Sequence, residues 1–288
     1  MANGILVIDK AAGWTSMDVC AKLRGMYQER RVGHAGTLDP MATGVLPVFL
    51  GRATRAVEFA AGGRKEYQAT LRLGLTTDTQ DVTGTVLETH PVSVAGPELE
   101  AVLTRFRGGI QQVPPMYSAL KVNGQKLYDL ARKGREVERR PRPVTIYALT
   151  VEKQLSDTDW ALRVVCSKGT YVRTLCHDIG AALGCGGAMA ALRRTEAAGF
   201  TLEQALTLEQ VQDARDRAAL LLPVDTCFAH LPRLDLTAAQ AKCVRNGLAF
   251  TWQGDQGEFR AYGPAGEFLA VCRTEEGKLI TVKSFFDV

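Results

Sequence analysis

In this 288-residue chain, the order of the hydrophobic patterns along the sequence is the feature that most constrains the fold. Segments typical of strands outnumber segments typical of helices, and the two kinds do not alternate strictly. Strict alternation would predict a doubly wound sheet of parallel strands. The order present here instead predicts an α+β fold built on a mixed sheet.

Hydrophobic periodicity places the individual elements. Apolar or alternating runs predict strands at residues 4–10, 44–50, 65–74, 144–155 and 160–169. Helices are predicted at residues 15–27, 54–61, 97–108, 171–184 and 207–222. The first of these helices begins with Thr15 and Asp18, a pair typical of a capping box. Residues 77–85 (TDTQDVTGT) predict an acidic turn that contains glycine.

The segment 111–142 interrupts this pattern, because it is polar, basic and broken by three prolines. Only one short helix, at residues 126–133, is predicted within it. Residues 121–142 contain eight Lys or Arg and three Asp or Glu, so they carry 8 − 3 = +5, against +4 for the whole chain. Such a basic stretch suits contact with phosphate groups, although a solvated charged loop is the commoner explanation. We predict an excursion from the body of the domain.

The C-terminal part reads as a separate unit. Two prolines mark residues 222–234 as a linker, and a helix is predicted at residues 237–246 with Gly247 as its stop. Short strands between glycine-rich turns follow. We therefore predict two domains, residues 1–230 and a small β-rich domain at residues 233–288. From residue 237 onward six basic residues balance six acidic ones, so binding of a polyanion there would depend on geometry rather than bulk charge.

Cysteine and histidine usage argues against several kinds of site. Seven cysteines, with no C-x-x-C pair, predict reduced thiols rather than a disulfide framework. Four scattered histidines lack the spacing of zinc ligands, so no metal site is predicted. No apolar run is long enough to span a membrane, and the first residues lack the features of a signal peptide. We therefore expect a cytoplasmic protein.

Residues 33–47, GHAGTLDPMATGVLP, hold Asp39 in a loop stiffened by glycine and proline. The two common phosphate-binding glycine patterns are absent from the chain. Glycoside hydrolysis would need two carboxylates, and the sequence offers one well-placed acid. An aspartate that caps its own turn is the ordinary explanation for such a stretch. Residue statistics alone therefore leave the role of Asp39 open.

The longer pattern closely resembles the signature of the TruB family of tRNA pseudouridine synthases. Further matches follow in family order: GILVIDK, KEYQATLRLG with TDT, PPMYSALKVNGQKLYDLARKG, SKGTYVRTLCHDIGAALG and ALRR. They cover most of residues 4–200. The resemblance implies a largely antiparallel sheet of the pseudouridine synthase type with flanking helices. It also implies that residues 111–142 are an insertion that grips RNA, and that the C-terminal domain is PUA-like.

The resemblance implies conversion of uridine 55, in the T loop of transfer RNA, to pseudouridine. Uracil leaves C1′ of the ribose and is reattached through its C5 atom. Nothing is added or lost, so no cofactor or energy source is expected. Asp39 matches the catalytic carboxylate, and the sequence leaves open whether it attacks C1′ or assists a route through a glycal. In either case the carboxylate must be ionised and held rigidly, which suits this loop.

Other site residues follow from the same resemblance. Arg173 matches the arginine that pairs with the aspartate, and a guanidinium can orient a carboxylate bidentately. Tyr67 matches the tyrosine that stacks on the target base, since an aromatic face can hold a base that must rotate. His34 matches a histidine that contacts RNA and helps occupy the space of the extruded nucleotide. Tyr171 and Leu192 match positions that line the uracil pocket. Without the resemblance, each of these residues has an ordinary structural explanation.

Contacts to the RNA backbone are expected from exposed cations. The candidates are Lys10, Arg52, Lys133, Arg135, Arg139 and Arg140, with Arg55, Arg64 and Lys65 as further possibilities. The expected partner is the T-stem loop of transfer RNA, with no membrane and no obligatory protein partner, and we expect a monomer. Two alternatives stay open: an RNA-guided relative that works within a ribonucleoprotein, and an RNA-folding chaperone in which catalysis is secondary. The basic insertion and the absence of long Lys-rich tails favour the stand-alone enzyme.

Overall fold

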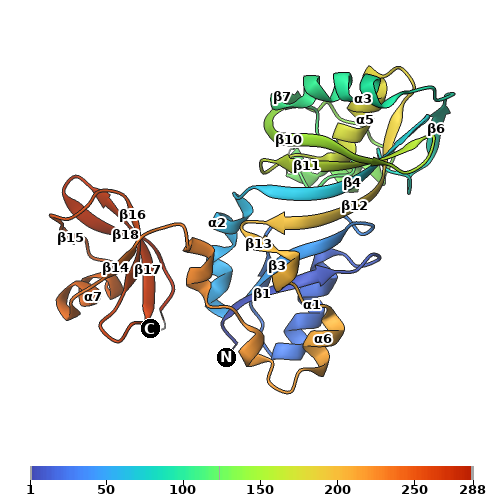
Figure 1. Cartoon of the computed structure of the whole chain (residues 1–288). Coiled ribbons are helices and arrows are strands. Elements are labelled where there is room, and N and C mark those ends of the chain that lie inside the picture. The colour runs from blue at the N-terminus through green and yellow to red at the C-terminus, as the bar shows by residue number, and fades with distance from the viewer. Residues whose placement is uncertain (1, 123, 287–288) are drawn as a thin grey trace.

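The computed structural model describes residues 2–122 and 124–286 (Figure 1). Residues 1, 123, 287 and 288, which fall within the predicted domain and insertion ranges, lie outside the described residues. The described chain forms a large sheet with helices packed against it and a smaller C-terminal sheet. It therefore has the predicted α+β fold. Within the described ranges, no helix is long and apolar enough to cross a membrane.

The large sheet has nine strands, and its main path runs in the order β1-β3-β12-β4-β11-β10-β7. These strands are β1 (Gly4–Lys10), β3 (Thr43–Leu50), β12 (Gly187–Ala197), β4 (Lys65–Leu73), β11 (Asp159–Cys166), β10 (Arg142–Gln154) and β7 (Gly108–Gln112). In addition, β2 (Val32–His34) pairs with β3 and β13 (Phe200–Thr201) pairs with β12. All neighbours are antiparallel except β12 and β3, which run parallel. The sheet is mixed and largely antiparallel, as predicted.

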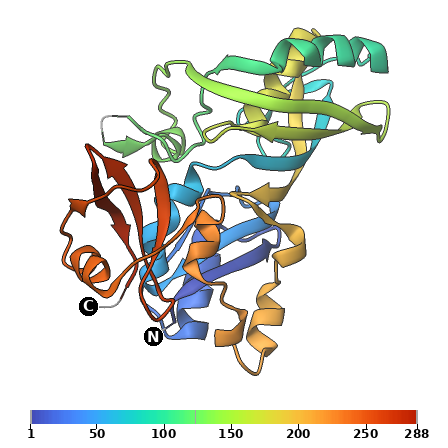
Figure 2. The same cartoon turned by 60° about the vertical axis from the view of Figure 1, so that its left-hand side comes forward.

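The helices that pack against one face of this sheet include α1 (Ser16–Tyr27), α3 (Gly96–Leu103) and α5 (Val172–Ala182). Leu23, Leu103 and Ile179, one from each helix, belong to a buried cluster that also contains residues of β4 and β11. Helix α1 begins as predicted, because Thr15 and Asp18 exchange the two hydrogen bonds of a capping box, at 3.1 and 2.9 Å. The main core thus lies between these helices and the sheet (Figure 2).

Strand β4 shows why the two faces of the sheet differ. Its residues Tyr67 and Leu71 point into the core and are buried. Glu66, which directly precedes Tyr67, forms an ion pair with Arg163 of β11, at 2.6 Å, on the opposite face. Successive side chains of a strand point to opposite faces, so this alternation leaves one face apolar and the other polar.

Short elements connect these layers. They are α2 (Val57–Ala61), the paired strands β5 (Leu75–Thr77) and β6 (Val86–Thr89), the paired strands β8 (Lys121–Val122) and β9 (Gln125–Lys126), α4 (Leu127–Ala131) and α6 (Leu208–Asp213). The predicted insertion contains β8, β9 and α4. Gln112 is the last residue of β7 and Arg142 is the first of β10, so the part of this range outside the large sheet is residues 113–141.

Strand β12 was not predicted, and one predicted helix is shorter than expected. No strand was predicted at residues 187–197, where β12 lies, because its many alanines do not suggest a strand. The helix predicted at residues 207–222 ends at Asp213. It ends there because the guanidinium of Arg217 turns back and donates hydrogen bonds to the carbonyls of Val211 and Gln212, at 3.1 and 2.7 Å.

The C-terminal part is a five-stranded sheet in the order β14-β16-β17-β18-β15, with one helix. Its elements are β14 (Arg233–Asp235), α7 (Ala238–Arg245), β15 (Phe250–Thr251), β16 (Glu258–Tyr262), β17 (Phe268–Glu275) and β18 (Lys278–Ser284). The predicted linker is packed rather than exposed, since Phe228 within it is 1% exposed. Its ring meets Phe59 of α2 and Phe285 at centroid distances of 5.2 and 5.4 Å. These aromatic rings join the C-terminal sheet to α2. The C-terminal sheet lies beside this part of the large domain in Figure 2.

Candidate active site

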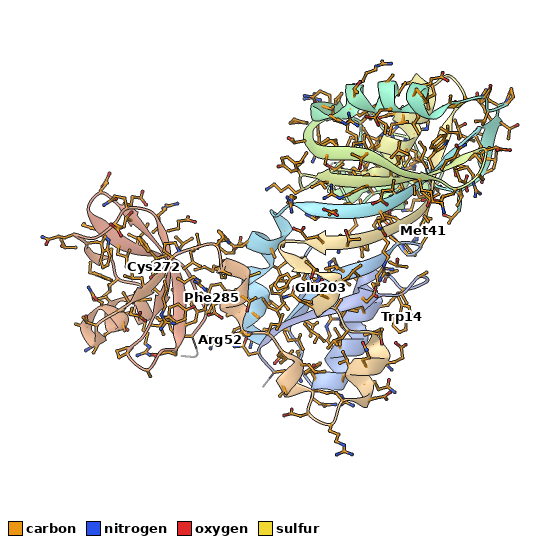
Figure 3. All side chains as sticks on the ribbon, viewed as in Figure 1. Trp14, Met41, Arg52, Glu203, Cys272 and Phe285 are labelled. Carbon is orange, nitrogen blue, oxygen red and sulfur yellow. The ribbon has the colours of Figure 1, made fainter. Side chains whose placement is uncertain are left out.

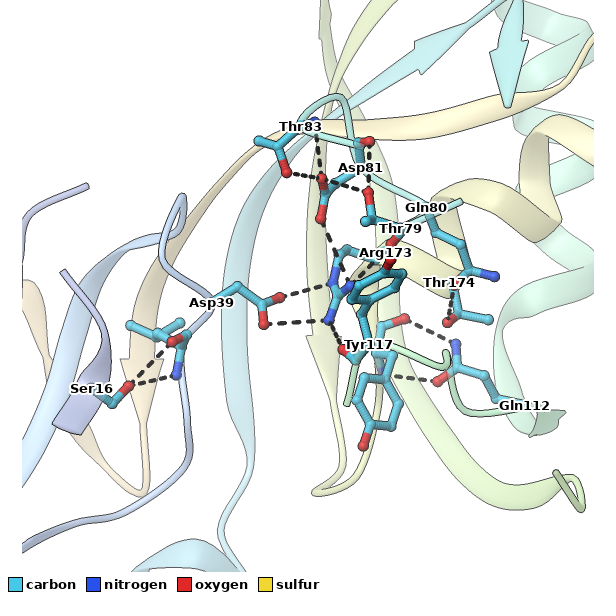
Figure 4. Close-up of polar contacts among 12 residues, drawn as sticks. Ser16, Asp39, Thr79, Gln80, Asp81, Thr83, Gln112, Tyr117, Arg173 and Thr174 are labelled. Carbon is cyan, nitrogen blue, oxygen red and sulfur yellow. Dashed lines mark hydrogen bonds and ion pairs between the residues drawn. The ribbon is translucent and has the colours of Figure 1, made fainter. Parts of the chain in front are cut away.

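Asp39 lies in the loop that connects β2 to β3, and buried groups hold this loop on both sides. The hydroxyl of Ser16 accepts a hydrogen bond from the N–H of Leu38, at 2.9 Å, and donates one to its carbonyl, at 3.2 Å (Figure 4). Arg194, which is fully buried, donates to the carbonyls of Gly36 and Val45, at 3.0 and 2.7 Å. The loop is therefore braced at its beginning, centre and end.

A close approach of two strands explains one glycine of the motif. Gly44 is the second residue of β3 and has a φ of 99°, at the point where β3 runs beside β12. A Cβ atom at this position would lie 2.2 Å from the carbonyl oxygen of Arg194. Only glycine fits such a contact at a positive φ. The glycine near the end of the motif thus allows β3 and β12 to pair next to Asp39.

The structure corrects the prediction for Lys10. Its side chain is 1% exposed, so it is not available to an RNA backbone. Its ammonium group donates hydrogen bonds to the carbonyls of Ala11, Trp14 and Pro40, at 3.0, 2.7 and 3.2 Å. Burial lowers the pKa of Lys10 to about 8, an effect that the nearby Asp39 opposes. Lys10 supports the Asp39 loop from within the protein. Lys65 is also buried, at 8% exposure.

Asp39 and Arg173 form an ion pair, as predicted from the family pattern. The Nε atom of Arg173 lies 2.9 Å from one carboxylate oxygen, and Nη2 lies 3.3 Å from the other (Figure 4). Arg173 is 5% exposed, whereas the Asp39 side chain is 36% exposed. A buried guanidinium thus presents a partly exposed carboxylate to solvent in a fixed orientation.

Three further groups hold Arg173 in place. Its Nη1 donates to the carbonyl of Thr79, at 3.0 Å, and its Nη2 donates to the carbonyl of Tyr117, at 2.8 Å. Its Nη1 also lies 3.7 Å from the carboxylate of Asp81, which is buried. Asp81 accepts hydrogen bonds from the hydroxyls of Thr79 and Thr83 (Figure 4). The sequence indicated an acidic turn here, but no pattern in it predicted that the turn contacts Arg173.

Tyr67 and Leu192 form an apolar wall beside Asp39. They lie on the neighbouring strands β4 and β12, are 6% and 8% exposed, and share one buried cluster with Leu38. Burial raises the pKa of Tyr67, and the charge of Asp39 adds to this effect while Arg194 opposes it. The Tyr67 phenol is therefore within electrostatic range of the carboxylate and is uncharged at neutral pH.

Tyr171 lies within electrostatic range of Asp39, and His34 lies within electrostatic range of Arg194, which braces the Asp39 loop. Tyr171 directly precedes α5, and its pKa is raised by burial and also by Asp39. His34 is at the end of β2, and burial, together with the charge of Arg194, lowers its pKa. His34 is therefore a neutral imidazole near pH 7. Among the described residues, its Nδ1 atom is buried without a hydrogen-bond partner. No hydrogen bond found within the described ranges joins His34 to Asp39.

The predicted backbone contacts fall into two groups. Lys133, Arg135 and Arg140 are exposed on the insertion. Arg139 is mostly buried, because it donates hydrogen bonds to Glu136, at 2.8 Å, and to the carbonyl of Pro114, at 3.3 Å. The three exposed cations are available to bind phosphate, whereas Arg139 stabilises the fold of the insertion.

Arg52 has a different position from the one expected of a backbone contact. It lies at the junction of the two sheets, near Phe285 (Figure 3). Its guanidinium donates a hydrogen bond to the carbonyl of Phe286 in the C-terminal part. Two neighbouring contacts, Arg55 with Ser284 and Lys283 with Glu58, reinforce this junction at 3.0 and 2.6 Å. Arg52 thus connects the two parts of the chain.

The described residues contain no group of three or more His, Cys, Asp or Glu side chains that could hold a metal ion. Asp39 does not line either of two cavities of about 350 Å³ each. One of them lies beneath the insertion, between Tyr117, Arg139, Gln80 and His177. Tyr117, whose carbonyl accepts a hydrogen bond from Arg173, is among the residues that line it.

Family comparisons cover nearly the whole chain. The model described as "TruB family pseudouridylate synthase (N terminal domain)" matches residues 24–172. The models described as "tRNA pseudouridylate synthase B C-terminal domain" and "tRNA Pseudouridine synthase II, C terminal" match residues 173–229 and 231–286. The chain is 45% identical to a protein named tRNA pseudouridine synthase B from Azoarcus sp. (strain BH72), over 97% of this chain and 93% of the relative. A protein of the same name from Ralstonia pickettii (strain 12J) is 45% identical, over 91% and 85%.

Solved structures resemble the fold over the same extent. A chain in the crystal structure of a Cbf5–Nop10–Gar1 complex superposes with a TM-score of 0.76 at 27% identity. A chain in the archaeal box H/ACA sRNP Nop10–Cbf5 complex superposes with a TM-score of 0.73 at 26% identity. Each match covers 99% of this chain, with 85% and 86% of the respective solved chain. Together with the geometry of the Asp39 loop, these matches show that the chain belongs to the TruB family of pseudouridylate synthases.

Proposed function

We propose that this protein converts uridine 55 in the T loop of transfer RNA to pseudouridine, with Asp39 as the catalytic carboxylate. Family membership and relatives named tRNA pseudouridine synthase B support the reaction and the substrate class. The observation that carries the assignment of Asp39 is its bidentate pairing with the buried Arg173. An accessible carboxylate in a braced loop is what chemistry at C1′ of a ribose requires.

The reaction is a balanced isomerisation. The bond between C1′ and N1 breaks, the uracil turns, and a bond between C1′ and C5 forms. The C5 atom then loses its proton and N1 gains one, so no atom is gained or lost overall. Asp39 acts at the sugar in its ionised form, either by attack on C1′ or by assisting a glycal route. Arg173 maintains the orientation and charge of the carboxylate throughout.

The surrounding residues are proposed to hold the detached base. Tyr67 offers an aromatic face on which uracil can turn without being fixed in one orientation. Tyr171 and Leu192 complete the walls of the uracil pocket. The half-buried, neutral His34 is proposed to contact the RNA where the target nucleotide leaves its stack.

RNA binding outside the pocket is assigned to the insertion. The exposed side chains of Lys133, Arg135 and Arg140 suit contacts with phosphates, which position the T-stem loop without reading its sequence. The division into a catalytic domain at residues 1–230 and a PUA-like domain at residues 233–288 belongs to the same proposal, and the separate C-terminal sheet supports it. We further propose that the enzyme acts as a monomer in the cytoplasm, without an obligatory protein partner.

The deciding experiment incubates the purified protein alone with a T-stem-loop transcript and maps pseudouridine by base-specific chemical modification and primer extension. The expected result is pseudouridine at position 55. A requirement for a guide RNA or accessory proteins would favour the RNA-guided alternative. Improved folding of transfer RNA without any pseudouridine would favour the chaperone alternative.

A further inference from the structure

The side chain of Gln112 makes an unusual contact with the backbone of Tyr171. Its Nε2 donates to the Tyr171 carbonyl, at 3.0 Å, and its Oε1 accepts from the Tyr171 N–H, at 2.8 Å (Figure 4). Gln112 is 2% exposed, so both hydrogen bonds are shielded from water. The side-chain amide thus binds one residue of the main chain much as a neighbouring strand would.

Tyr171 lies between two elements of secondary structure, and its carbonyl also accepts a hydrogen bond from the N–H of Leu175, at 3.0 Å. Strand β11 ends at Cys166 and α5 begins at Val172, so Tyr171 belongs to neither element. Its side chain makes no capping hydrogen bond to the helix. Within the described ranges, the Gln112 amide is the acceptor found for its N–H. The start of α5 is therefore positioned by a side chain from β7 rather than by a cap of its own.

The same short segment also contacts the catalytic arginine. Arg173 is two residues after Tyr171, in the first turn of α5. Five residues after Gln112, the carbonyl of Tyr117 accepts a hydrogen bond of 2.8 Å from the Arg173 guanidinium. Gln112 thus binds Tyr171, and Tyr117 binds Arg173. The buried Pro114 and Pro115 lie between Gln112 and Tyr117 in the chain. The orientation of Arg173 toward Asp39 depends on both contacts.

We propose that Gln112 is a positioning residue for the uridine isomerisation: its amide fixes the Tyr171 backbone, and through it the uracil pocket and the Asp39–Arg173 pair. This inference rests on the function proposed above. The physical reason is that a shift of about 1 Å in a reacting group can slow a reaction on the order of 100-fold. A residue that only anchored the insertion would change RNA affinity or stability without changing the chemical step.

Two variants and one matched control test this role. Gln112→Leu removes both hydrogen bonds at similar volume. Gln112→Glu keeps the shape, but an ionised carboxylate repels the Tyr171 carbonyl, whereas a protonated carboxyl can donate to it. The control is Gln111→Glu, because Gln111 is the preceding residue of the same strand and is exposed. Each protein is measured for its single-turnover rate at saturating enzyme, its affinity for a T-stem-loop transcript and its thermal stability, with wild type alongside.

The pH dependence of Gln112→Glu is the sharpest readout. The introduced carboxyl would face the Tyr171 backbone. It would also lie beside Arg142, the residue of β10 that pairs with position 112 of β7. The phenol of Tyr171, whose pKa is raised by burial, stays neutral below about pH 9. Burial raises the pKa of a carboxyl, so protonation restores the second hydrogen bond in mildly acidic buffer. Relative to wild type, the rate of this variant should rise as pH falls from about 8 to about 5.5.

The expected results for Gln112→Leu are a single-turnover rate lowered on the order of 10- to 100-fold and an RNA affinity within about threefold of wild type. Gln111→Glu should match wild type in both. An unchanged rate for Gln112→Leu, or a pH profile of Gln112→Glu that parallels wild type, would overturn the proposal. Loss of folding in both variants would also overturn it, because it would assign Gln112 a purely structural role. A wild-type protein without activity would instead refute the proposed function.

Discussion

The ammonium group of Lys10 donates a hydrogen bond of 3.2 Å to the carbonyl of Pro40, the residue that follows Asp39. Thirty residues separate the two in the chain, and the contact ties the end of β1 to the Asp39 loop. Lys10 also donates to the carbonyls of Ala11 and Trp14, so backbone oxygens rather than a carboxylate solvate this buried charge. The rigidity of the Asp39 loop therefore depends on a cation that does not contact the substrate.

Replacing Lys10 with Met should destabilise the protein and slow the reaction. The change leaves three carbonyl groups without their donor, so the free energy of unfolding should fall by about 3 kcal/mol. The single-turnover rate should fall as well, because Pro40 is no longer held. Urea denaturation and single-turnover assays measure the two effects. Lys22→Met, on the exposed side of α1, is the control and should change neither. Wild-type stability in Lys10→Met would contradict this account.

Stability should also depend on pH through Lys10. Its pKa is lowered by burial from 10.5 to about 8 in the folded protein. Between these values the unfolded chain binds more protons, so the free energy of unfolding contributed by Lys10 rises with pH. The difference in unfolding free energy between wild type and Lys10→Met should therefore grow from about pH 8 to about pH 10. Below about pH 8 the difference should be constant. A difference that stays flat across the whole range would show that burial does not shift this lysine.

Asp39→Asn keeps the size of the side chain and removes its charge. We expect pseudouridine formation to be abolished, because a neutral amide can neither attack C1′ nor stabilise positive charge there. RNA affinity should remain within about threefold, since the contacts with phosphates are elsewhere. Asp157→Asn, in the exposed turn between β10 and β11, is the matched control. If Asp39→Asn formed pseudouridine at a rate comparable to wild type, the catalytic assignment would be wrong.

Neutralising the exposed cations of the insertion should separate binding from chemistry. Replacing Lys133, Arg135 and Arg140 together with Gln should weaken RNA binding. It should also reduce the slope of log affinity against log salt by about 1 for each phosphate that is no longer neutralised, because fewer counterions are released. Arg139 is kept, because its hydrogen bonds to Glu136 and Pro114 stabilise the insertion. The single-turnover rate at saturating enzyme should stay nearly unchanged.

The contrary outcome for the insertion is equally informative. An unchanged salt dependence together with a slower chemical step would mean that the insertion closes over the active site rather than anchoring RNA. The hydrogen bond between the Tyr117 carbonyl and Arg173 provides a route for such an effect. Binding measured at several salt concentrations, combined with single-turnover rates, distinguishes the two cases.

Activity is expected to persist in excess chelator without added nucleotide. The reaction leaves the oxidation state and the atom count of the nucleotide unchanged, so it needs neither a redox partner nor an energy source. The measurement is pseudouridine formation on a T-stem-loop transcript whose folding is monitored separately. Loss of activity that one divalent metal restored, while the RNA stayed folded throughout, would refute this expectation.

Local sequence patterns predicted the elements whose signals are short-range. Helix α1 follows from the capping pair Thr15 and Asp18, and strand β4 follows from the alternation in KEYQATLRL. Both depend on neighbours within a few residues, so the sequence contains their cause directly. The motif around Asp39 was equally visible, because glycine and proline restrict the same short loop. The resemblance added Arg173 as its partner, which helix periodicity alone would assign to the surface.

Tertiary structure alone decided the features that depend on distant partners. The Ala-rich segment Gly187–Ala197 becomes a central strand because it pairs with β4 on one side and β3 on the other. Lys10 is buried because the carbonyl of Pro40 approaches it, and Arg173 is buried because Asp81, Thr79 and Tyr117 surround it. The sequence by itself determined that Asp39 lies in a short loop restricted by glycine and proline. The free energy of these long-range contacts exists only once segments far apart in the chain are packed together, so only the fold could determine what holds Asp39 in place.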